Sequence, residues 1–187
     1  PSRTEAIAGL ASTFGLGPGD DVVIPEVAYP TYEVSALLAG ARAVRADSTV
    51  ALGPMNPALM FINSPSNPTG LVYSREELKA LAEVLRKHPQ VAIISDDIYN
   101  RLSFGEKLAP HLLHVAPDLR SRVVILNGAS KTYAMTGWRI GWAIGPKAIV
   151  TAMSNYQSQS VSCANSMSQY AAIEAIKNSD PDVAKTV

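Results

Sequence analysis

The sequence VAIISDDIY, residues 91–99, is a run of four apolar residues followed by a serine, two aspartates and, after Ile98, a tyrosine. A short continuous apolar run of this kind is typical of a strand that is buried on both faces of a sheet. The sequence VVILNGASK, residues 123–131, has the same order, with an asparagine and a lysine after the apolar run. Residues 22–24 and 59–62 are similar runs, so the pattern predicts four buried strands.

Amphipathic segments separate these runs. Ser74 and Glu77 have the spacing of a capping box, which predicts a helix that begins after Ser74. The apolar residues of this helix recur on one face, at Leu78, Leu81, Ala82 and Leu85. Further predicted helices are residues 6–14, 32–38 and 147–177, the last with weak breaks at 160–165; residues 42–46 and 140–144 are predicted strands, and residues 48–57 a loop. Apolar strands that alternate with helices predict an α/β fold, with a mostly parallel sheet and helices on both faces.

The composition is that of a globular domain with a low charge content. The chain has 187 residues, of which 47% are apolar, so it can bury a sizeable core in one domain. Sixteen basic and sixteen acidic residues cancel, which argues against a nucleic-acid or anionic membrane partner. Charged residues make up only 17%, against a typical share of about 25%. We therefore expect a partner subunit or further chain to cover part of the surface.

Cysteine content and the chain start give expectations about location. The single cysteine, Cys163, excludes an internal disulfide framework and favours a reducing compartment, so we expect a cytoplasmic protein. No apolar run approaches the ~20 residues that span a bilayer. The start, PSRTE, has no initiator methionine and does not resemble a signal peptide, so we expect a fragment of a longer protein.

Polar or aromatic side chains follow each of the four buried strands. In chain order they are Tyr29, Asn67, Asp96 with Tyr99, and Lys131. Ligands of such sheets bind outside the carboxyl ends of the strands, so we expect these groups to converge. Taken singly, each has an ordinary explanation: an aspartate that caps a helix, an asparagine in a turn, a solvated lysine. The hypothesis of a site depends on their joint occurrence.

This set of groups matches the needs of pyridoxal 5'-phosphate. The aldehyde of that cofactor requires a lysine amine, and its pyridine nitrogen requires a carboxylate. Its 3-oxygen needs neutral hydrogen-bond donors, its phosphate an arginine, and its ring face an aromatic side chain. Lys131 and Asp96 are candidates for the first two tasks, and Arg139 follows Lys131 by eight residues.

Three motifs resemble one family. They are SDDIY at residues 95–99, NSPSNPTG at 63–70 and GASKTYAMTGWRIG at 128–141. They resemble the class I/II aminotransferases, which are fold-type I pyridoxal-phosphate enzymes. The third motif is similar to the family's lysine-attachment signature at every position, and the resemblance extends over essentially the whole chain.

The resemblance implies a role for each matching residue. Lys131 would be the Schiff-base lysine and the catalytic proton carrier, and Asp96 the catalytic partner of the pyridine nitrogen. The remaining cofactor contacts would come from Asn67 and Tyr99 at the 3-oxygen, Arg139 at the phosphate and Tyr29 on the ring face.

Two hydroxyl residues are further candidates for the phosphate. Thr4 lies in a segment that resembles the end of the family's phosphate-binding loop, although Ser2 stands where the family usually has glycine. Ser130 is the second candidate, and a hydroxyl at the entry of a helix explains it equally well.

The resemblance also implies a domain arrangement, an assembly and a reaction. Residues 1–187 would be the cofactor-binding large domain, truncated at both ends and without the small C-terminal domain that carries the substrate-binding arginine. The family is dimeric, so we expect a homodimer of the full-length protein. The stretch from Lys131 onward and residues 154–164 resemble bacterial aspartate aminotransferases, whereas residues 17–47 resemble succinyldiaminopimelate aminotransferases. We expect ping-pong transamination of an amino acid to a 2-oxo acid, with aspartate or a related acidic donor.

Three alternatives stay open. A carbon–sulfur β-lyase or a decarboxylase of the same fold uses the same lysine, aspartate and arginine. A transcription regulator with a cofactor-binding domain would need a basic helix-turn-helix; these residues contain none, but a missing N-terminal segment could hold one. The third alternative is a fragment without activity of its own. We expect no metal site, because His111 and His114 have no cysteine or carboxylate at ligand spacing, and we expect Cys163 to be a packed or incidental thiol.

Overall fold

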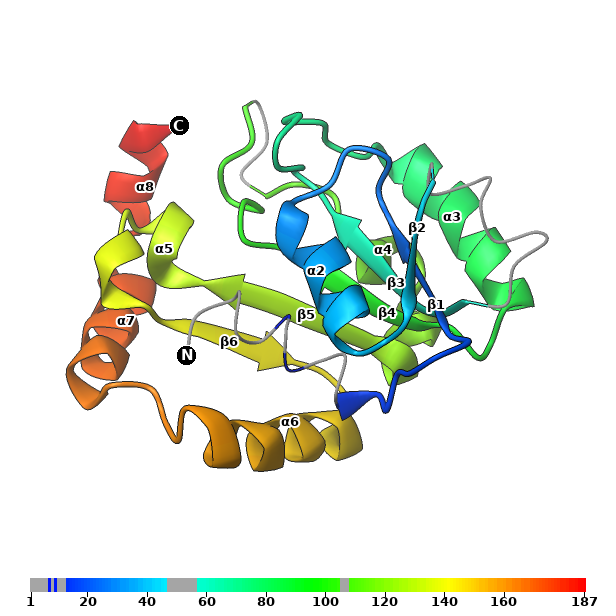
Figure 1. Cartoon of the computed structure of the whole chain (residues 1–187). Coiled ribbons are helices and arrows are strands. Elements are labelled where there is room, and N and C mark those ends of the chain that lie inside the picture. Colours follow the sequence, from blue (N-terminus) through cyan, green and yellow to red (C-terminus); the bar gives the residue numbers. More distant parts are fainter. Residues whose placement is uncertain (1–6, 8, 10–12, 47–56, 105–107) are drawn as a thin grey trace.

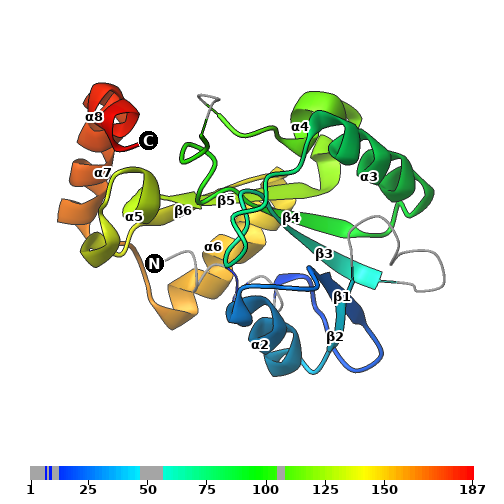
Figure 2. The ribbon, with the colours of Figure 1, turned by 90° about the horizontal axis from the view of Figure 1, so that it is seen from above.

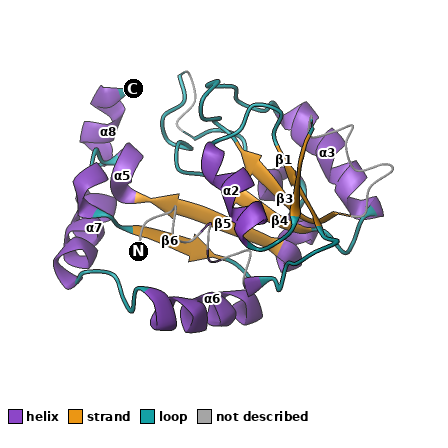
Figure 3. Ribbon diagram, viewed as in Figure 1, coloured by secondary structure: helices purple, strands orange, loops and turns teal. Residues whose placement is uncertain are grey.

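A computed structural model describes residues 7, 9, 13–46, 57–104 and 108–187. Within them, six strands form one sheet in the order β2-β1-β3-β4-β5-β6 (Figures 1 and 3). The strands are β1 (Asp21–Ile24), β2 (Arg42–Arg45), β3 (Pro57–Asn63), β4 (Ala92–Asp96), β5 (Val123–Gly128) and β6 (Gly141–Ile144). Neighbouring strands are parallel except for β6, which runs antiparallel to β5. The predicted α/β class with a mostly parallel sheet is therefore confirmed.

Helices cover both faces of the sheet. The α-helices are α2 (Pro30–Leu38), α3 (Arg75–Lys87), α4 (Leu112–Val115), α5 (Ala129–Thr132), α6 (Lys147–Ser160), α7 (Ser166–Asn178) and α8 (Asp180–Thr186), and the 3₁₀ helices are η1 (Pro117–Arg122) and η2 (Thr136–Trp138). Figure 2 shows α3 and α4 on one side of the sheet, and α2 and α6 on the other. Among the described residues, no helix has both the length and the apolar character needed to cross a membrane.

The two faces of the sheet bury separate apolar clusters, because successive strand residues point to opposite sides. Met60 and Ile93 pack with Leu78 and Leu81 of α3 on one face. On the other face, the cluster includes Tyr32, Phe61, Ile94 and Leu126. A third, smaller cluster joins Ala129 and Ile140 to Ala172 of α7. The two large clusters fix the sheet between its helices.

Helix α3 begins as the capping box predicts. The Glu77 backbone N–H donates to Ser74 Oγ, and the Ser74 backbone N–H donates to a Glu77 carboxylate oxygen. At the other end, His88 is the C-cap residue. The guanidinium of Arg122 donates to the backbone oxygens of Leu85, His88 and Val91 at 2.6–2.8 Å. The Leu85 and His88 oxygens also accept backbone N–H groups, from His88 and Val91, so Arg122 adds a second donor to each at the end of the helix.

Most predicted elements occur with shifted ends. The four buried strands are longer by one to three residues than their apolar runs, and the predicted strand at 140–144 begins at Gly141. The predicted helix at 147–177 is two helices, α6 and α7, divided at the expected breaks. Residues 7, 9 and 13 are helical, as expected for 6–14, whose other members up to residue 12 lie outside the described residues. Of the predicted loop at 48–57, only Pro57 is described, and it begins β3.

Candidate active site

The carboxyl ends of β3 and β4 meet at a pair of polar residues. Asn63 and Asp96 are register partners at the ends of these strands, and both are buried. Asn63 Nδ2 donates to the backbone oxygen of Asp96 at 2.9 Å, and its Oδ1 accepts from the backbone N–H of Asn67 at 2.8 Å. One amide therefore joins the segment that carries Asp96 to the segment that carries Asn67.

The side chain of Asp96 is held from the helix side. Asp96 has no exposed surface, and its Oδ2 accepts a hydrogen bond from the Tyr32 hydroxyl at 2.5 Å. The ring of Tyr32 stacks on Phe61, with centroids 4.6 Å apart, and meets the edge of Tyr29 at 5.9 Å. A buried carboxylate is costly without such partners, so this hydrogen bond supports a charge at the strand end.

Tyr99 lies between Asn67 and Lys131. Asn67 Nδ2 lies 3.5 Å from the Tyr99 hydroxyl, and Lys131 Nζ lies 5.8 Å from the centroid of the Tyr99 ring. A chain of contacts thus runs from Tyr29 through Tyr32 to Asp96, and on through Asn63, Asn67 and Tyr99 to Lys131. Five of the residues predicted from the sequence are brought together in this way: Tyr29, Asn67, Asp96, Tyr99 and Lys131.

Lys131 lies in a short segment between β5 and β6, within helix α5, and is exposed. Gly128 precedes this helix, and a Cβ at that position would lie 2.9 Å from the backbone oxygen of Ile140. A side chain at residue 128 would therefore push the lysine-bearing turn away from β6.

Ser130 and Arg139, the two described candidates for the phosphate, both form hydrogen bonds with Thr136. The hydroxyl of Thr136 donates to the backbone oxygen of Ser130 at 3.2 Å, and the guanidinium of Arg139 donates to the backbone oxygen of Thr136 at 2.9 Å. Arg139 is exposed and has a left-handed backbone with φ of 50°. Ser130 and Arg139 lie in the same segment as Lys131. Among the described residues, they are connected to the other site residues through that segment. Thr4 lies outside the described residues.

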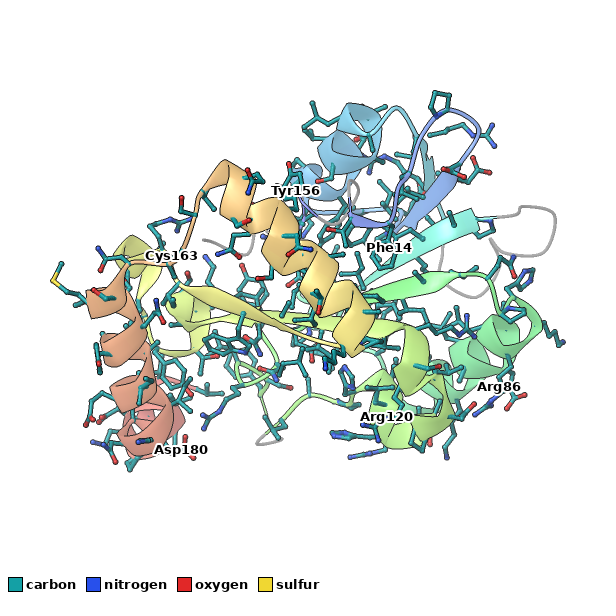
Figure 4. The ribbon with its side chains drawn as sticks, turned by 90° about the horizontal axis from the view of Figure 1, so that it is seen from below. Phe14, Arg86, Arg120, Tyr156, Cys163 and Asp180 are labelled. Carbon is teal, nitrogen blue, oxygen red and sulfur yellow. The ribbon has the colours of Figure 1, made fainter. Side chains whose placement is uncertain are left out.

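Arg101 ties the segments of Tyr99 and Lys131 to the last helix. Its guanidinium donates to the Tyr133 hydroxyl at 3.2 Å and lies 2.7 Å from a carboxylate oxygen of Asp180. Figure 4 shows Asp180 at the start of α8, and Cys163 between α6 and α7. Cys163 is exposed, so of the two expected kinds of thiol it is not a packed one.

The titratable side chains of Asp97 and His111 form a pair behind Asp96, on the α4 side of the sheet. Asp97 Oδ1 accepts from the Ser95 hydroxyl at 2.6 Å, and its Oδ2 lies 3.3 Å from His111 Nε2. Burial, together with the charge of Asp96, raises the pKa of Asp97 to about 7, although the Ser95 hydrogen bond opposes this rise. Burial is also the larger cause that lowers the pKa of His111 to about 4, and nearby His114 adds to it. The fold thus places the Asp97 carboxyl beside His111, although the two residues are well separated in the sequence.

Among the described residues, no three side chains of the metal-binding types are grouped so that they could hold an ion. The Asp97–His111 pair lines a pocket of about 170 Å³ together with Asn100 and His114. His111 Nδ1 accepts from the Leu113 backbone N–H at 3.1 Å, which leaves Nε2 to carry the proton of the neutral ring.

Four residues of the site lie outside the set predicted from the sequence: Tyr32, Asn63, Asp97 and His111. Asn63 and Asp97 do stand at strand ends, which is a signal that could have selected them. The sequence pattern places Tyr32 only at the start of a helix, and it carries no signal that joins His111 to Asp97.

Comparison with known proteins places the chain in a family. Residues 2–186 match the family model described as aminotransferase class I and II. The chain belongs to the class I and II aminotransferases. It is 44% identical, over 178 residues, to an aspartate/prephenate aminotransferase of Nitrosomonas europaea; the match covers 88% of this chain and 44% of that protein. It is 42% identical over 173 residues to the aspartate aminotransferase of Geobacillus stearothermophilus, covering 86% and 44%.

Solved structures of this aminotransferase family have the same fold. The aspartate aminotransferase of Thermotoga maritima superposes with a TM-score of 0.87 at 31% identity, and the match covers 99% of this chain and 52% of that one. The chain thus spans about half the length of the relatives it matches.

Proposed function

We propose that this chain is the cofactor-binding large domain of a pyridoxal-phosphate-dependent aminotransferase that acts on an acidic amino acid and a 2-oxo acid. The observation that carries the proposal is the contact chain from Asp96, through its backbone oxygen, Asn63, Asn67 and Tyr99, to the Lys131 amine. Family membership and relatives named as aspartate or aspartate/prephenate aminotransferases support the reaction and the acidic substrate.

The groups at the site fit pyridoxal phosphate. Asp96 is a buried carboxylate that could hold a protonated pyridine nitrogen, and Asn67 and Tyr99 offer two neighbouring donors for the 3-oxygen. Tyr29 is the candidate for the ring face. Arg139 and Ser130 are the described candidates for the phosphate. When bound, the cofactor supplies an aldehyde that takes up the substrate's amino group and a ring that accepts the electron pair left at the α-carbon.

The protein's own part in the reaction is positioning and proton transfer. Lys131 would hold the cofactor covalently until the amino acid replaces it, and its freed amine would then take the proton from the substrate α-carbon. The position of this amine beside Tyr99 makes it effective, because a base that is fixed next to the substrate needs no diffusional encounter. Lys131 would return the proton to the cofactor's side of the molecule. Asp96 would keep the pyridine nitrogen protonated throughout.

We also propose a cytoplasmic homodimer for the complete protein. The support is a surface that is apolar along α7, where Met167, Tyr170, Ile173 and Ile176 are exposed. Exposed apolar faces of this kind mark surfaces that are covered in an assembly.

The first test is covalent trapping. The purified protein is mixed with pyridoxal phosphate, its absorbance is recorded, and borohydride is added before peptide mapping. We expect a stable adduct on Lys131 that is lost in Lys131→Ala and kept in Lys79→Ala, a control lysine on the first turns of α3. Asp96→Ala should keep the adduct but lose turnover.

The second test identifies the reaction in the complete protein. Aspartate with 2-oxoglutarate should give oxaloacetate and glutamate with ping-pong kinetics. Release of pyruvate and sulfide from cysteine-type substrates, or of carbon dioxide, would instead assign a β-lyase or a decarboxylase. A folded wild-type protein without any Lys131 adduct would overturn the proposed function.

A further inference from the structure

The apolar surroundings of the Tyr32 side chain explain its ring but not its hydroxyl. Its ring lies without exposure in the cluster around Phe61 and Ile94, and a phenylalanine would fill the same apolar space. The hydroxyl is therefore the part of the residue that needs a function. It reaches Asp96 Oδ2 at 2.5 Å, across 64 positions of sequence.

The ring of Tyr32 is held firmly, which makes its hydroxyl a well-placed donor. It stacks on Phe61 with an angle of 18° between the ring planes, and Tyr29 packs against it edge-on at 72°. The same residue belongs to the first turn of α2, which begins at Pro30. A donor whose ring and backbone are both packed loses little freedom when it forms a hydrogen bond.

A fixed donor has two effects on a buried carboxylate. It sets the rotation of the carboxylate about its own Cβ–Cγ bond, and it stabilises the ionised form, which burial otherwise disfavours. Asp96 is fully buried, so both effects act at full strength.

We propose that Tyr32 is a positioning residue, whose hydroxyl orients the Asp96 carboxylate and keeps it ionised for the pyridine nitrogen of the cofactor. This inference rests on the proposed function. It assigns a task to a residue outside the three motifs that resemble the family, and it makes α2 part of the site.

The test uses Tyr32→Phe, which removes one oxygen and keeps the packed ring. The matched control is Tyr73→Phe, which removes the same atom from a half-buried tyrosine packed on the other cluster. The protein is loaded with pyridoxal phosphate carrying ¹⁵N in its ring. The ring nitrogen shift is followed from about pH 6 to about pH 9, and the dissociation constant of the cofactor is measured.

In Tyr32→Phe we expect the ring nitrogen to lose its proton at a lower pH than in the wild type. The cofactor should also bind about tenfold more weakly, because it must then orient the carboxylate itself. Tyr73→Phe should match the wild type in both measurements. A purely structural hydroxyl would lower the melting temperature of Tyr32→Phe and leave the nitrogen titration unchanged, and that result would overturn the inference.

A second measurement covers the case in which Tyr32→Phe does not fold. A phenolic proton held by Asp96 should give a slowly exchanging proton resonance in the wild-type protein, and this resonance should disappear in Asp96→Asn. Its presence unchanged in Asp96→Asn would also overturn the inference. The two proposals fail in different ways: a missing Lys131 adduct in the wild type removes the proposed function, whereas a normal adduct with an unchanged nitrogen titration removes only the role of Tyr32.

Discussion

Replacing either member of the Asp97–His111 pair should uncover a dependence of stability on pH that the intact pair conceals. The carboxyl and imidazole side chains are 9% and 13% exposed, so burial disfavours the charged form of each. The pKa of Asp97 rises from 3.8 to about 7. The pKa of His111 falls from 6.5 to about 4.

The two shifts act on stability with opposite signs. Between the unfolded and folded pKa values of Asp97, the folded protein holds a proton that the unfolded chain has lost, so the free energy of unfolding falls as the pH rises. For His111, the unfolded chain holds the extra proton, so the free energy of unfolding rises with pH. The stability that the neutral His111 contributes is lost as the pH falls toward about 4. From about pH 4.5 to about pH 6.5, each contribution changes by about 2 kcal/mol, and the two nearly cancel.

The assay is urea denaturation of the wild type and three variants across that pH range. Relative to the wild type, His111→Gln should become less stable by about 2 kcal/mol as the pH rises, and Asp97→Asn should become more stable by about the same amount. The double variant should be flat. Constant offsets from a lost hydrogen bond do not matter, because only the change with pH is compared.

An ion pair between the two side chains would give a different result. Asp97 would then be ionised and His111 charged across the whole range, and each slope would vanish or change sign. Single variants that are both parallel to the wild type would therefore refute the assignment of a neutral pair.

Three further substitutions test how the site is supported, each by urea denaturation. Ser74→Ala removes the capping box of α3 and should cost about 1 kcal/mol, with an unchanged denaturant slope; no loss would show that the box contributes nothing. Arg122→Met removes donors to three backbone oxygens and should cost about 2 kcal/mol, with faster hydrogen exchange in the last turn of α3 alone. Gly128→Ala places a Cβ 2.9 Å from the Ile140 oxygen, so it should destabilise the fold by about 1–3 kcal/mol and reduce adduct formation at Lys131; a variant as stable as the wild type would contradict this contact.

Elements with a strong periodic or apolar pattern were the predictable part of the fold. Helix α3 carries both a capping box and an apolar face, and each of the four buried strands contains an uninterrupted apolar run of three or four residues. The short helices α4 and α5 have four residues each, which is too few to show a period. They exist because of packing against the rest of the chain, which the sequence pattern does not contain.

The candidate site was predictable where topology alone determines it. Parallel strands bring their carboxyl ends to one edge, so Asn67, Asp96 and Lys131 could be grouped without knowing any side-chain direction. Tyr32 could not be found in this way, because its hydroxyl reaches Asp96 from a helix that precedes it by 64 residues. A tyrosine inside an apolar segment gives no sign of where its hydroxyl points.

The adjacent aspartates at the end of β4, Asp96 and Asp97, show how the fold separates two residues of the same type. Successive residues of a strand point to opposite faces, so Asp96 faces Tyr32 and Asp97 faces Ser95 and His111. The first receives a phenol that stabilises a charge, whereas burial and the neighbouring charge raise the pKa of the second to about 7. Two neighbouring carboxyl groups in such different surroundings are able to serve different tasks. If the second were ionised as well, two negative charges would share one buried strand end, so the raised pKa of Asp97 favours a charge on Asp96 alone.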